Sequence, residues 1–356
     1  MQAKGANEPA MFTPVADFLC VGGASILVAL WVLAAGVRLP AQSHWLMHLT
    51  NFAINAPHFL VSYRLLYGSP RRRSDYRAVS VYVPAALAVY LVFALAICTH
   101  TPQFLGAMIG VGTLLLAWHY TGQAYGMIAS FAFLAGLRLS ATERHLLRAN
   151  LYVLLAWHVG WALVAQRDMF NPTSGGSTLL AQATAAGIYR WMTLAALASS
   201  VCGLAALGMM VRRTGRLPTL RMVAPWVAIH LWYVLLYREP AAIFWAQNAH
   251  ALQYLLFPMR VEMNRSQAET ANPERLGKHM LAYYLGTVVL GLIVMQLMPE
   301  FLQLGIHRLG YGSLPVQLGI VAFVNIHHYF IDNFIWKLRN PVVRRELFAH
   351  VPSPAS

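Results

Sequence analysis

Charged residues and cysteines are both scarce in this chain of 356 residues. Asp, Glu, Lys and Arg together make up 11% of it, whereas a soluble domain carries about 25%. Because 58% of the residues are hydrophobic, this composition excludes an ordinary soluble domain and indicates a protein that lies in lipid. The cysteines, Cys20, Cys98 and Cys202, form no CxxC pair and lie in or beside apolar runs. We therefore expect neither a disulfide framework nor a thiolate metal site.

Acidic residues are the scarcest charged class. The 12 Asp and Glu are outnumbered by 26 Lys and Arg, which gives a formal net charge of +14. In membrane proteins Lys and Arg concentrate in the cytoplasmic loops, and the sequence shows no soluble module with a basic face. The excess positive charge therefore predicts contact with the lipid bilayer, and no nucleic-acid partner is expected.

Long apolar runs fill most of the chain. A membrane-spanning helix needs about 20 mainly apolar residues, and by this criterion the sequence predicts an all-α, polytopic integral membrane bundle of about ten helices. We expect one transmembrane domain over residues 1–356, with its longest outer loop at 169–186. The predicted spans are 15–36, 43–66, 79–98, 104–136, 149–166, 190–211, 222–237, 240–259, 280–298 and 313–336.

Two features of these spans carry local predictions. The run 104–136 is too long for one straight crossing, so we expect it to tilt, to protrude or to kink near Gly122 and Gly126. Arg238-Glu239-Pro240 predicts a tight turn between two spans, because Pro240 suits the first turn of a helix.

Basic clusters give the orientation. With about ten spans, every large cluster falls on the same side of the membrane, which the positive-inside rule makes cytoplasmic. Both termini are then cytoplasmic, in a cell inner membrane. The clusters are Arg71-Arg72-Arg73 with Arg77, Arg138/Arg144/Arg148, Arg212/Arg213/Arg216/Arg221, Arg260/Arg265/Arg275/Lys278 and Lys337/Arg339/Arg344/Arg345.

Several of the 14 histidines fall inside the predicted spans, where ionisable residues are costly and usually mark function. Five of them lie at similar depth, about 10 to 15 residues from the outer end of their helices at roughly 1.5 Å per residue. Structural histidines have no reason to agree in depth, so the pattern predicts one shared metal site. The predicted ligands are His58, His119, His250, His327 and His328.

Helical faces add polar neighbours to these histidines. Gln123 and the two glycines share the face of His119, and the glycines would let another helix approach closely. Tyr254 shares the face of His250, and we expect it to take part in catalysis.

The span 313–336 carries two adjacent histidines and an aspartate. His328 shares its face with Asn325 and Asp332, whereas His327 points away. We therefore expect at least one of the two histidines to bind metal, and both only if the centre is dinuclear. Asp332 is the only carboxylate deep inside a predicted span, and it is assigned a catalytic or ligand role. The alternative is an ion pair between Asp332 and Lys337.

Four further histidines are left open. His44 and His48 form an HxxxH pair that suits an outer metal site, or an interfacial polar pair. The pair lies about 21 Å along the helix from His58, too far to share its metal. His158 and His230 stand alone on their helices, so hydrogen bonding to neighbours is expected, with ligation as the alternative.

A histidine-rich, thiolate-free site suits iron, copper or zinc. The number of imidazoles exceeds what one closed zinc site uses, so we expect non-haem iron, mononuclear or dinuclear, over copper or zinc. Aromatic residues near the histidines predict an apolar pocket and a lipophilic substrate, such as a fatty acyl chain, an isoprenoid or a carotenoid. These aromatic residues are Trp118, Tyr120, Tyr125, Trp245, Tyr254, Tyr329 and Phe330.

Short boxes around the histidines resemble the Brp/Blh family of bacterial membrane β-carotene dioxygenases. The boxes are Pro57-His58, Trp118-His119-Tyr120, Asn248-Ala249-His250 and His327-His328-Tyr329-Phe330-Ile331-Asp332. They follow the same order as in that family and cover about a tenth of the chain. The resemblance implies an iron site. The chain departs from the family at Ser62, where an Asp is usual, and at Tyr254, where a second His is usual. His-box desaturases and hydroxylases are a looser comparison, through His44-Trp45-Leu46-Met47-His48.

Three functions remain open from the sequence. The first is a membrane iron oxygenase or desaturase, which would draw any electrons from an external donor because no flavin, nicotinamide or ferredoxin motif is present. The second is a proton-coupled transporter, for which the sequence shows no clear inverted repeat. The third is a haem b electron carrier, which would leave most of the histidines without a role.

Overall fold

The computed structural model describes residues 9–39, 45–98, 100–165, 179–310 and 315–351. Every regular element in these ranges is helical, which confirms the all-α prediction for them. Eight helices in the described part of the chain are long and apolar enough to cross a membrane, so the architecture is that of a membrane helical bundle. They are Pro14–Ala35, Ala78–Ile97, Gln103–Leu134, Ala141–Val164, Ala186–Thr214, Leu220–Arg238, Pro273–Arg308 and Val316–Ile335.

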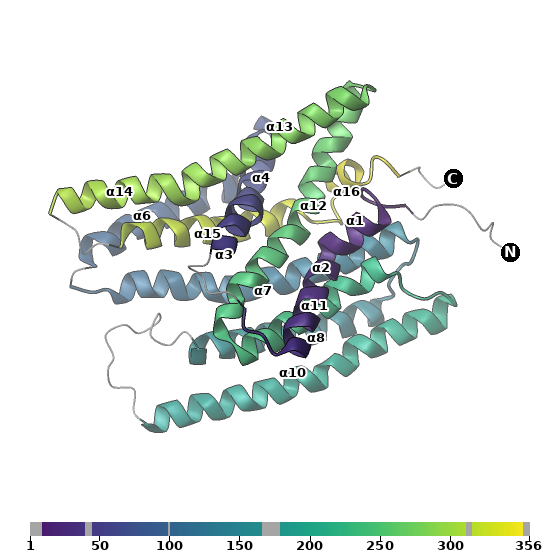
Figure 1. Ribbon diagram of the computed structural model, residues 1–356, viewed down its shortest axis with the longest axis horizontal. Helices are drawn as coiled ribbons and strands as arrows, with labels where there is room; N and C mark the ends of the chain where they lie inside the picture. The colour runs from purple at the N-terminus through teal and green to yellow at the C-terminus, as the bar shows by residue number, and fades with distance from the viewer. Residues whose placement is uncertain (1–8, 40–44, 99, 166–178, 311–314, 352–356) are drawn as a thin grey trace.

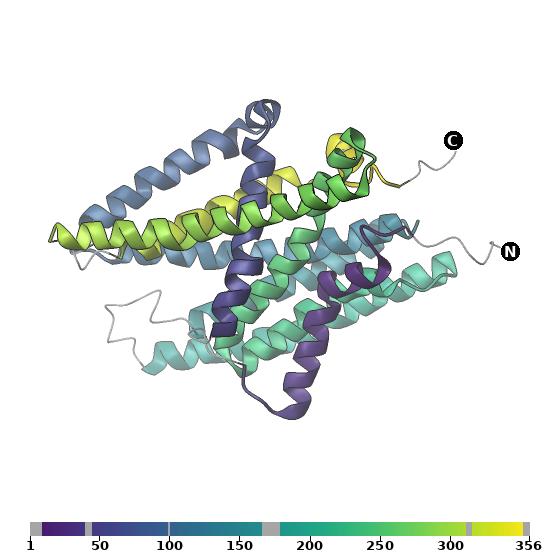
Figure 2. The same cartoon turned by 45° about the horizontal axis from the view of Figure 1, so that its top comes forward.

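The two other predicted spans, 43–66 and 240–259, are also helical over their described residues, from Trp45 onward in the first, but they are not among these eight. Their polar residues lower their hydropathy, and both helices cross the long axis of the molecule steeply (Figures 1 and 2). The first consists of α3 (Trp45–Thr50), η2 (Asn51–Asn55) and α4 (Ala56–Tyr67); the second consists of η4 (Pro240–Ala242) and α12 (Ile243–Glu269).

The N-terminal span bends at a glycine. It consists of α1 (Pro14–Phe18), η1 (Leu19–Gly23) and α2 (Ala24–Ala35), and the Thr13 hydroxyl caps α1 by accepting from the Ala16 amide at 3.1 Å. Gly22 has φ +148°, where only glycine is comfortable, and a Cβ there would lie 2.8 Å from the Ala224 carbonyl oxygen. The bend therefore lets the span pack closely on the helix that contains Ala224.

The remaining helices run mostly along the long axis of the molecule (Figure 1). They are α5 (Pro70–Asp75), η3 (Ala78–Tyr82), α6 (Val83–Ile97), α7 (Gln103–Leu134), α8 (Ala141–Ala165), α10 (Leu179–Thr214), α11 (Leu220–Arg238), α13 (Pro273–Leu292), η5 (Ile293–Leu297), α14 (Met298–Arg308), α15 (Val316–Ile335) and α16 (Pro341–Leu347). The predicted turn at Arg238-Glu239-Pro240 is confirmed, since α11 ends at Arg238 and Pro240 opens η4.

Two local predictions were wrong. The helix α7 is continuous over 32 residues, and a Cβ added at Gly122 or Gly126 would meet no atom within 4 Å. The close helix approach predicted at these glycines is therefore absent. Of the three alternatives for this run, the continuous helix favours a tilt or a protrusion over a kink. The expected loop at 169–186 is helical from Leu179 onward, while residues 169–178 lie outside the described part of the chain.

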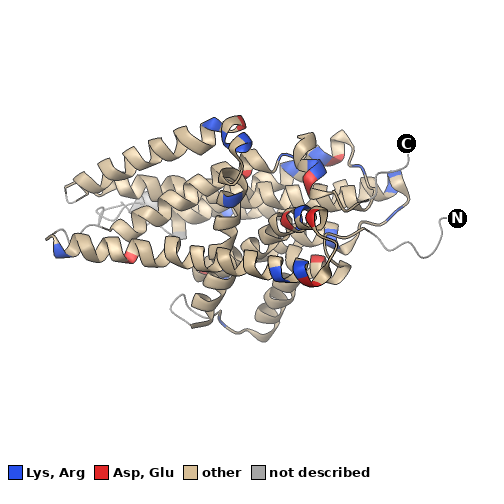
Figure 3. Ribbon diagram, turned by 90° about the horizontal axis from the view of Figure 1, so that it is seen from above, with Lys and Arg blue, Asp and Glu red and all other residues tan. Residues whose placement is uncertain are grey.

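Basic residues gather toward the end of the bundle where both termini lie (Figure 3). Ion pairs tie this end together. Arg213 pairs with Glu143 at 2.7 Å, and Arg221 pairs with the fully buried Asp17 at 3.3 Å. Asp17 also accepts the Met11 amide at 2.7 Å, so the chain before α1 is fixed against the bundle.

The helix α7 lies at the centre of the molecule. It packs against α8, α11 and α15, and its residues belong to both large hydrophobic clusters. The inclined helices α4 and α12 contact each other, and α4 also packs on α15. The most polar stretches of the chain therefore meet the two long helices α7 and α15 in the interior.

Candidate metal centre

Four helices bring five metal-ligand side chains together in the interior. They form two groups that share His119, and within each group one ligand atom per residue lies within 4.8 Å of the others. None of the five side chains belongs to a residue more than 7% exposed. The residues are His58 on α4, His119 on α7, His250 on α12, and His328 and Asp332 on α15.

The closest distances join atoms that normally bind metals. His119 Nε2 lies 2.9 Å from His250 Nε2, and His328 Nε2 lies 3.1 Å from Asp332 Oδ2. Asp332 Oδ2 also lies 3.7 Å from His119 Nε2. The ring of His58 closes the group, with its centroid 4.7 Å from that of His328. The donor atoms thus converge on one small volume.

Several of these atoms have no hydrogen-bond partner in the described part of the chain. They include both ring nitrogens of His328, Nδ1 of His250 and Oδ2 of Asp332, and all are buried. Buried polar atoms are nearly always paired, because an unpaired one costs about 1–3 kcal/mol. A cation among them would satisfy His328 Nε2 and Asp332 Oδ2 together, so the donor set fits a metal ion.

Hydrogen bonds fix the Asp332 carboxylate. Its Oδ1 accepts from the Tyr254 hydroxyl at 2.7 Å and from the Ser62 hydroxyl at 2.9 Å. Trp336 Nε1 donates to the Tyr254 oxygen at 2.7 Å. This arrangement leaves Oδ2 facing the imidazoles. The alternative pair with Lys337 is absent among the described residues, since Lys337 Nζ lies over the Phe334 ring at 4.6 Å.

His58 is oriented by its own helix. Its Nδ1 donates to the Asn55 carbonyl oxygen, which leaves Nε2 as a lone-pair donor. Metal-binding histidines commonly use their second nitrogen in this way. Pro57 has no amide hydrogen, so the Ala53 carbonyl lacks its helical donor. The Tyr284 hydroxyl of α13 takes that place.

Glutamines position the helix of His250. Gln123 Nε2 of α7 donates to the His250 carbonyl at 3.0 Å and to Gln253 Oε1 at 3.2 Å. Gln253 Nε2 in turn donates to the Val21 carbonyl at 2.6 Å, at the bend of the N-terminal span. The predicted shared face of His119 and Gln123 is therefore confirmed, although its partner is α12 and the contact is polar.

Aromatic rings enclose the imidazoles. Phe59 lies 4.0 Å from the His58 ring, and Tyr120 lies 4.5 Å from the His250 ring. Tyr329 lies 4.7 Å from the His119 ring. Of the other predicted aromatic residues, Phe330 packs on a separate hydrophobic cluster and Tyr125 lies under the Arg148 guanidinium, at 4.4 Å. The aromatic wall is thus smaller than predicted and includes Phe59.

His327 is turned away from this group. Its Nδ1 lies 2.9 Å from the Tyr63 hydroxyl, and its Nε2 lies 2.9 Å from the Val79 carbonyl oxygen. Both ring nitrogens therefore have protein partners, and the structure does not bring His327 to the centre. The divergence of His327 and His328 around the helix was predicted.

The remaining candidate histidines also lie apart from the centre. His48 is exposed on α3, and no group of metal-ligand side chains in the described residues includes it. His44 lies outside the described residues. His158 Nδ1 lies 3.1 Å from the Tyr233 hydroxyl, and His230 Nδ1 donates to the Trp226 carbonyl oxygen at 2.7 Å.

Sequence reasoning missed two members of the site. Ser62 was noted only as a departure from a family pattern, and Trp336 was assigned no role. Ser62 lies one helical turn after His58, and this spacing was the available signal.

No family model matches this chain, and no curated protein or solved structure matches it either.

Proposed function

We propose that the chain is an integral-membrane, non-haem iron enzyme of the oxygenase or desaturase type that acts on a lipophilic substrate. One observation carries this proposal: five buried ligand side chains from four helices converge while several of their donor atoms lack a protein partner. A helix-packing role would leave those atoms paired.

The donor set favours iron. His119, His328 and Asp332 together make two imidazoles and one carboxylate, the ligand combination typical of non-haem iron oxygenases. His58 and His250 would complete the coordination of the same ion, or hold a second ion without His119, because His119 Nε2 has one lone pair to donate. Copper and zinc are the alternatives. A haem would require its axial ligands on opposite faces of a wide ring, which five convergent donor atoms do not favour.

The surroundings favour a lipid-borne substrate. Phe59, Tyr120 and Tyr329 cover the imidazoles, so water has little access and an apolar chain would be well accommodated. A fatty acyl chain, an isoprenoid or a carotenoid fits this description. The resemblance to the Brp/Blh family supports iron and leaves these three substrate classes open. The two positions at which the chain departs from that family lie together here, since Ser62 and Tyr254 are 2.6 Å apart and both contact Asp332.

Iron in such a site supplies the capacity to bind and activate O₂. The protein residues position the ligand side chains. Tyr254 and Ser62 donate hydrogen bonds to Asp332 Oδ1, so that Oδ2 faces the space between the imidazoles. The Asn55 carbonyl oxygen orients the His58 ring by accepting from its Nδ1. A desaturase reaction would draw electrons from an external donor, whereas a dioxygenase reaction would need none.

The topology is part of the proposal. We place the inclined helices α3–α4 and α12 within the membrane, which gives about ten spans. Both termini then lie on the cytoplasmic side of a cell inner membrane, next to the basic end of the bundle. Reporter fusions that place residues 70–78 or 212–221 outside would contradict this topology.

Metal analysis tests the proposal. The protein is purified in a neutral detergent, reconstituted with ferrous iron and analysed for metal content and optical spectrum. We expect tightly bound iron without the intense Soret band of haem. The double variant His58→Ala/His250→Ala should lose most of the iron, whereas His145→Ala, outside the site, should retain it. Full iron in the double variant, or no iron in the wild type, would contradict the proposal.

A further inference from the structure

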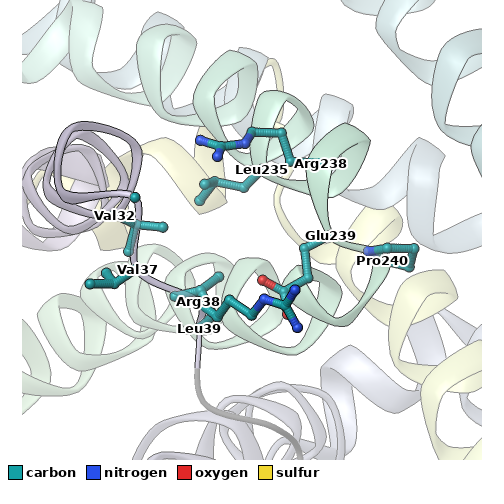
Figure 4. Close-up of a pocket in the computed structure, with 9 residues that line it drawn as sticks. Val32, Val37, Arg38, Leu39, Leu235, Arg238, Glu239 and Pro240 are labelled. Carbon is teal, nitrogen blue, oxygen red and sulfur yellow. The ribbon is translucent and has the colours of Figure 1, made fainter.

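A pocket lies apart from the candidate metal centre, at the end of two candidate membrane-spanning helices. Its volume is about 420 Å³, and its lining comes from the end of α2, the residues that follow it, the end of α11 and Pro240. Pockets of about 300–1,000 Å³ are typical of small-molecule sites. Figure 4 shows Val32 and Val37 on one side of the opening, with Glu239 and Pro240 across from them.

Three charged side chains line this pocket. Arg38, Arg238 and Glu239 have no ion pair or hydrogen bond through their side chains to any described residue. Two guanidinium groups and one carboxylate give the lining a net charge of +1. The pocket therefore suits an occupant with a single negative charge. A carboxylate fits this lining, because the planar guanidinium fork donates two parallel hydrogen bonds to it.

The rest of the lining is aliphatic. Val32, Leu39 and Leu235 are buried side chains of the wall, and they provide no hydrogen-bonding group to a ligand. The outer surface of α2 next to this wall is also apolar, with Leu30 and Trp31 at least half exposed. An acyl chain attached to the anion would lie against the exposed Val37 and the apolar outer surface of α2.

The position of the pocket indicates where the anion comes from. The candidate spans Pro14–Ala35 and Leu220–Arg238 both end beside it. The end of a spanning helix lies at the headgroup level of a bilayer. In the proposed topology this end of the two helices is the outer one, so the pocket faces the outer leaflet.

We propose that this pocket binds the carboxylate of a fatty acid, with Arg38 and Arg238 as the anion-binding residues and Val37 with the apolar surface of α2 as the contact for its chain. The site shares no residue with the metal centre. His250 lies ten residues after Pro240 along α12, about 15 Å away at the helical rise. Binding here is therefore independent of whether the histidines hold iron.

The test uses two ligands of equal chain length. Native mass spectrometry of the detergent-purified protein measures the binding of dodecanoate and of uncharged 1-dodecanol, with inorganic phosphate as a competitor. We expect dodecanoate to bind, 1-dodecanol to bind at least tenfold more weakly, and phosphate to leave dodecanoate bound. A charge-assisted hydrogen bond contributes enough for Arg38→Gln and Arg238→Gln each to weaken dodecanoate binding by roughly tenfold.

Variants that remove a positive or a negative charge from the lining distinguish binding in this pocket from nonspecific adsorption of dodecanoate to the protein. Glu239→Gln raises the net charge of the lining from +1 to +2, so it should tighten dodecanoate binding. Arg308→Gln removes an exposed arginine at the end of α14, outside the pocket, and should change nothing. Equal binding of acid and alcohol, unchanged binding in both pocket arginine variants, or complete displacement by phosphate would each overturn the proposal. Iron content, measured in the same samples, reports separately on the metal centre.

Discussion

Two buried polar regions of the bundle differ in how their atoms are satisfied. One is the candidate metal centre, and the other is a network on α8, α10 and α11 around Asn150. In that network Trp226 Nε1 donates to Asn150 Oδ1 at 2.7 Å, and Asn150 Nδ2 donates to Ser199 Oγ at 2.9 Å. His230 Nδ1 lies 2.7 Å from the Trp226 carbonyl oxygen.

The comparison distinguishes polar residues that join helices from polar residues that could bind a metal. Around Asn150, each of these polar atoms has a protein partner, which is what a hydrogen bond between membrane helices requires. In the metal centre, His328 and Asp332 carry unpaired buried atoms that face each other. A histidine inside the membrane therefore indicates a ligand site when its neighbours are also donors without partners.

The largest effect is expected at the residue shared by both ligand groups. His119→Ala removes one donor from each group, so it should abolish tight iron binding while the protein still elutes as a folded species. Metal content per chain after gel filtration measures the result. Iron retained at the wild-type level would make this cluster no different from the Asn150 network.

Asp332→Asn comes next, because it preserves the shape and removes the charge. Loss of a carboxylate that orients a ligand costs about 10- to 100-fold in metal affinity, and loss of a direct ligand costs more. We therefore expect iron affinity to fall by at least tenfold, as measured by competition with a chelator. Affinity equal to that of the wild type would leave Asp332 with a structural role only.

Tyr254→Phe should have a smaller effect on the same carboxylate. It removes one of the two hydroxyl donors to Asp332 Oδ1 and leaves Ser62 in place. We expect a several-fold decrease in iron affinity and a changed optical spectrum of the bound metal. Tyr63→Phe is the matched control, because that hydroxyl contacts His327 outside the centre. Equal effects of the two variants would contradict the assignment.

The smallest effect on metal is expected in the Asn150 network. Asn150→Ala breaks two interhelical hydrogen bonds, so it should lower the stability of the fold by about 1 kcal/mol, the range measured for such bonds in membranes. Thermal unfolding in detergent would detect this as a lower Tm. Iron content should stay at the wild-type level. A loss of iron in this variant would contradict the claim that the Asn150 network takes no part in metal binding.

The fold was predictable where the apolar runs are unbroken. The helices α6, α7, α11 and α15 lie close to their predicted ranges, because length and hydropathy suffice for such segments. The inclination of α4 and α12 was not predictable. These helices pack through contacts with other helices, such as the bonds from Gln123 of α7 to α12 and from Gln253 of α12 to Val21, and no pattern within one helix reveals such contacts.

The candidate site was predictable in its ligands and less so in its surroundings. Agreement in depth selected His58, His119, His250 and His328, and the structure brings these together. His327 has the same depth but the wrong face, so depth alone could not exclude it. Ser62 of α4 donates to Asp332, and Trp336 at the end of α15 donates to Tyr254 of α12. Both bonds join different helices, so only the tertiary structure reveals them.

X-ray absorption at the iron edge tests the central claim most directly. It is measured on the iron-reconstituted wild-type protein, with the His119→Ala variant as the blank. The account predicts a ligand shell of nitrogen and oxygen atoms with the multiple scattering of several imidazoles, absent from the variant. Sulfur neighbours, a porphyrin signature, or an imidazole signal that survives His119→Ala would contradict it.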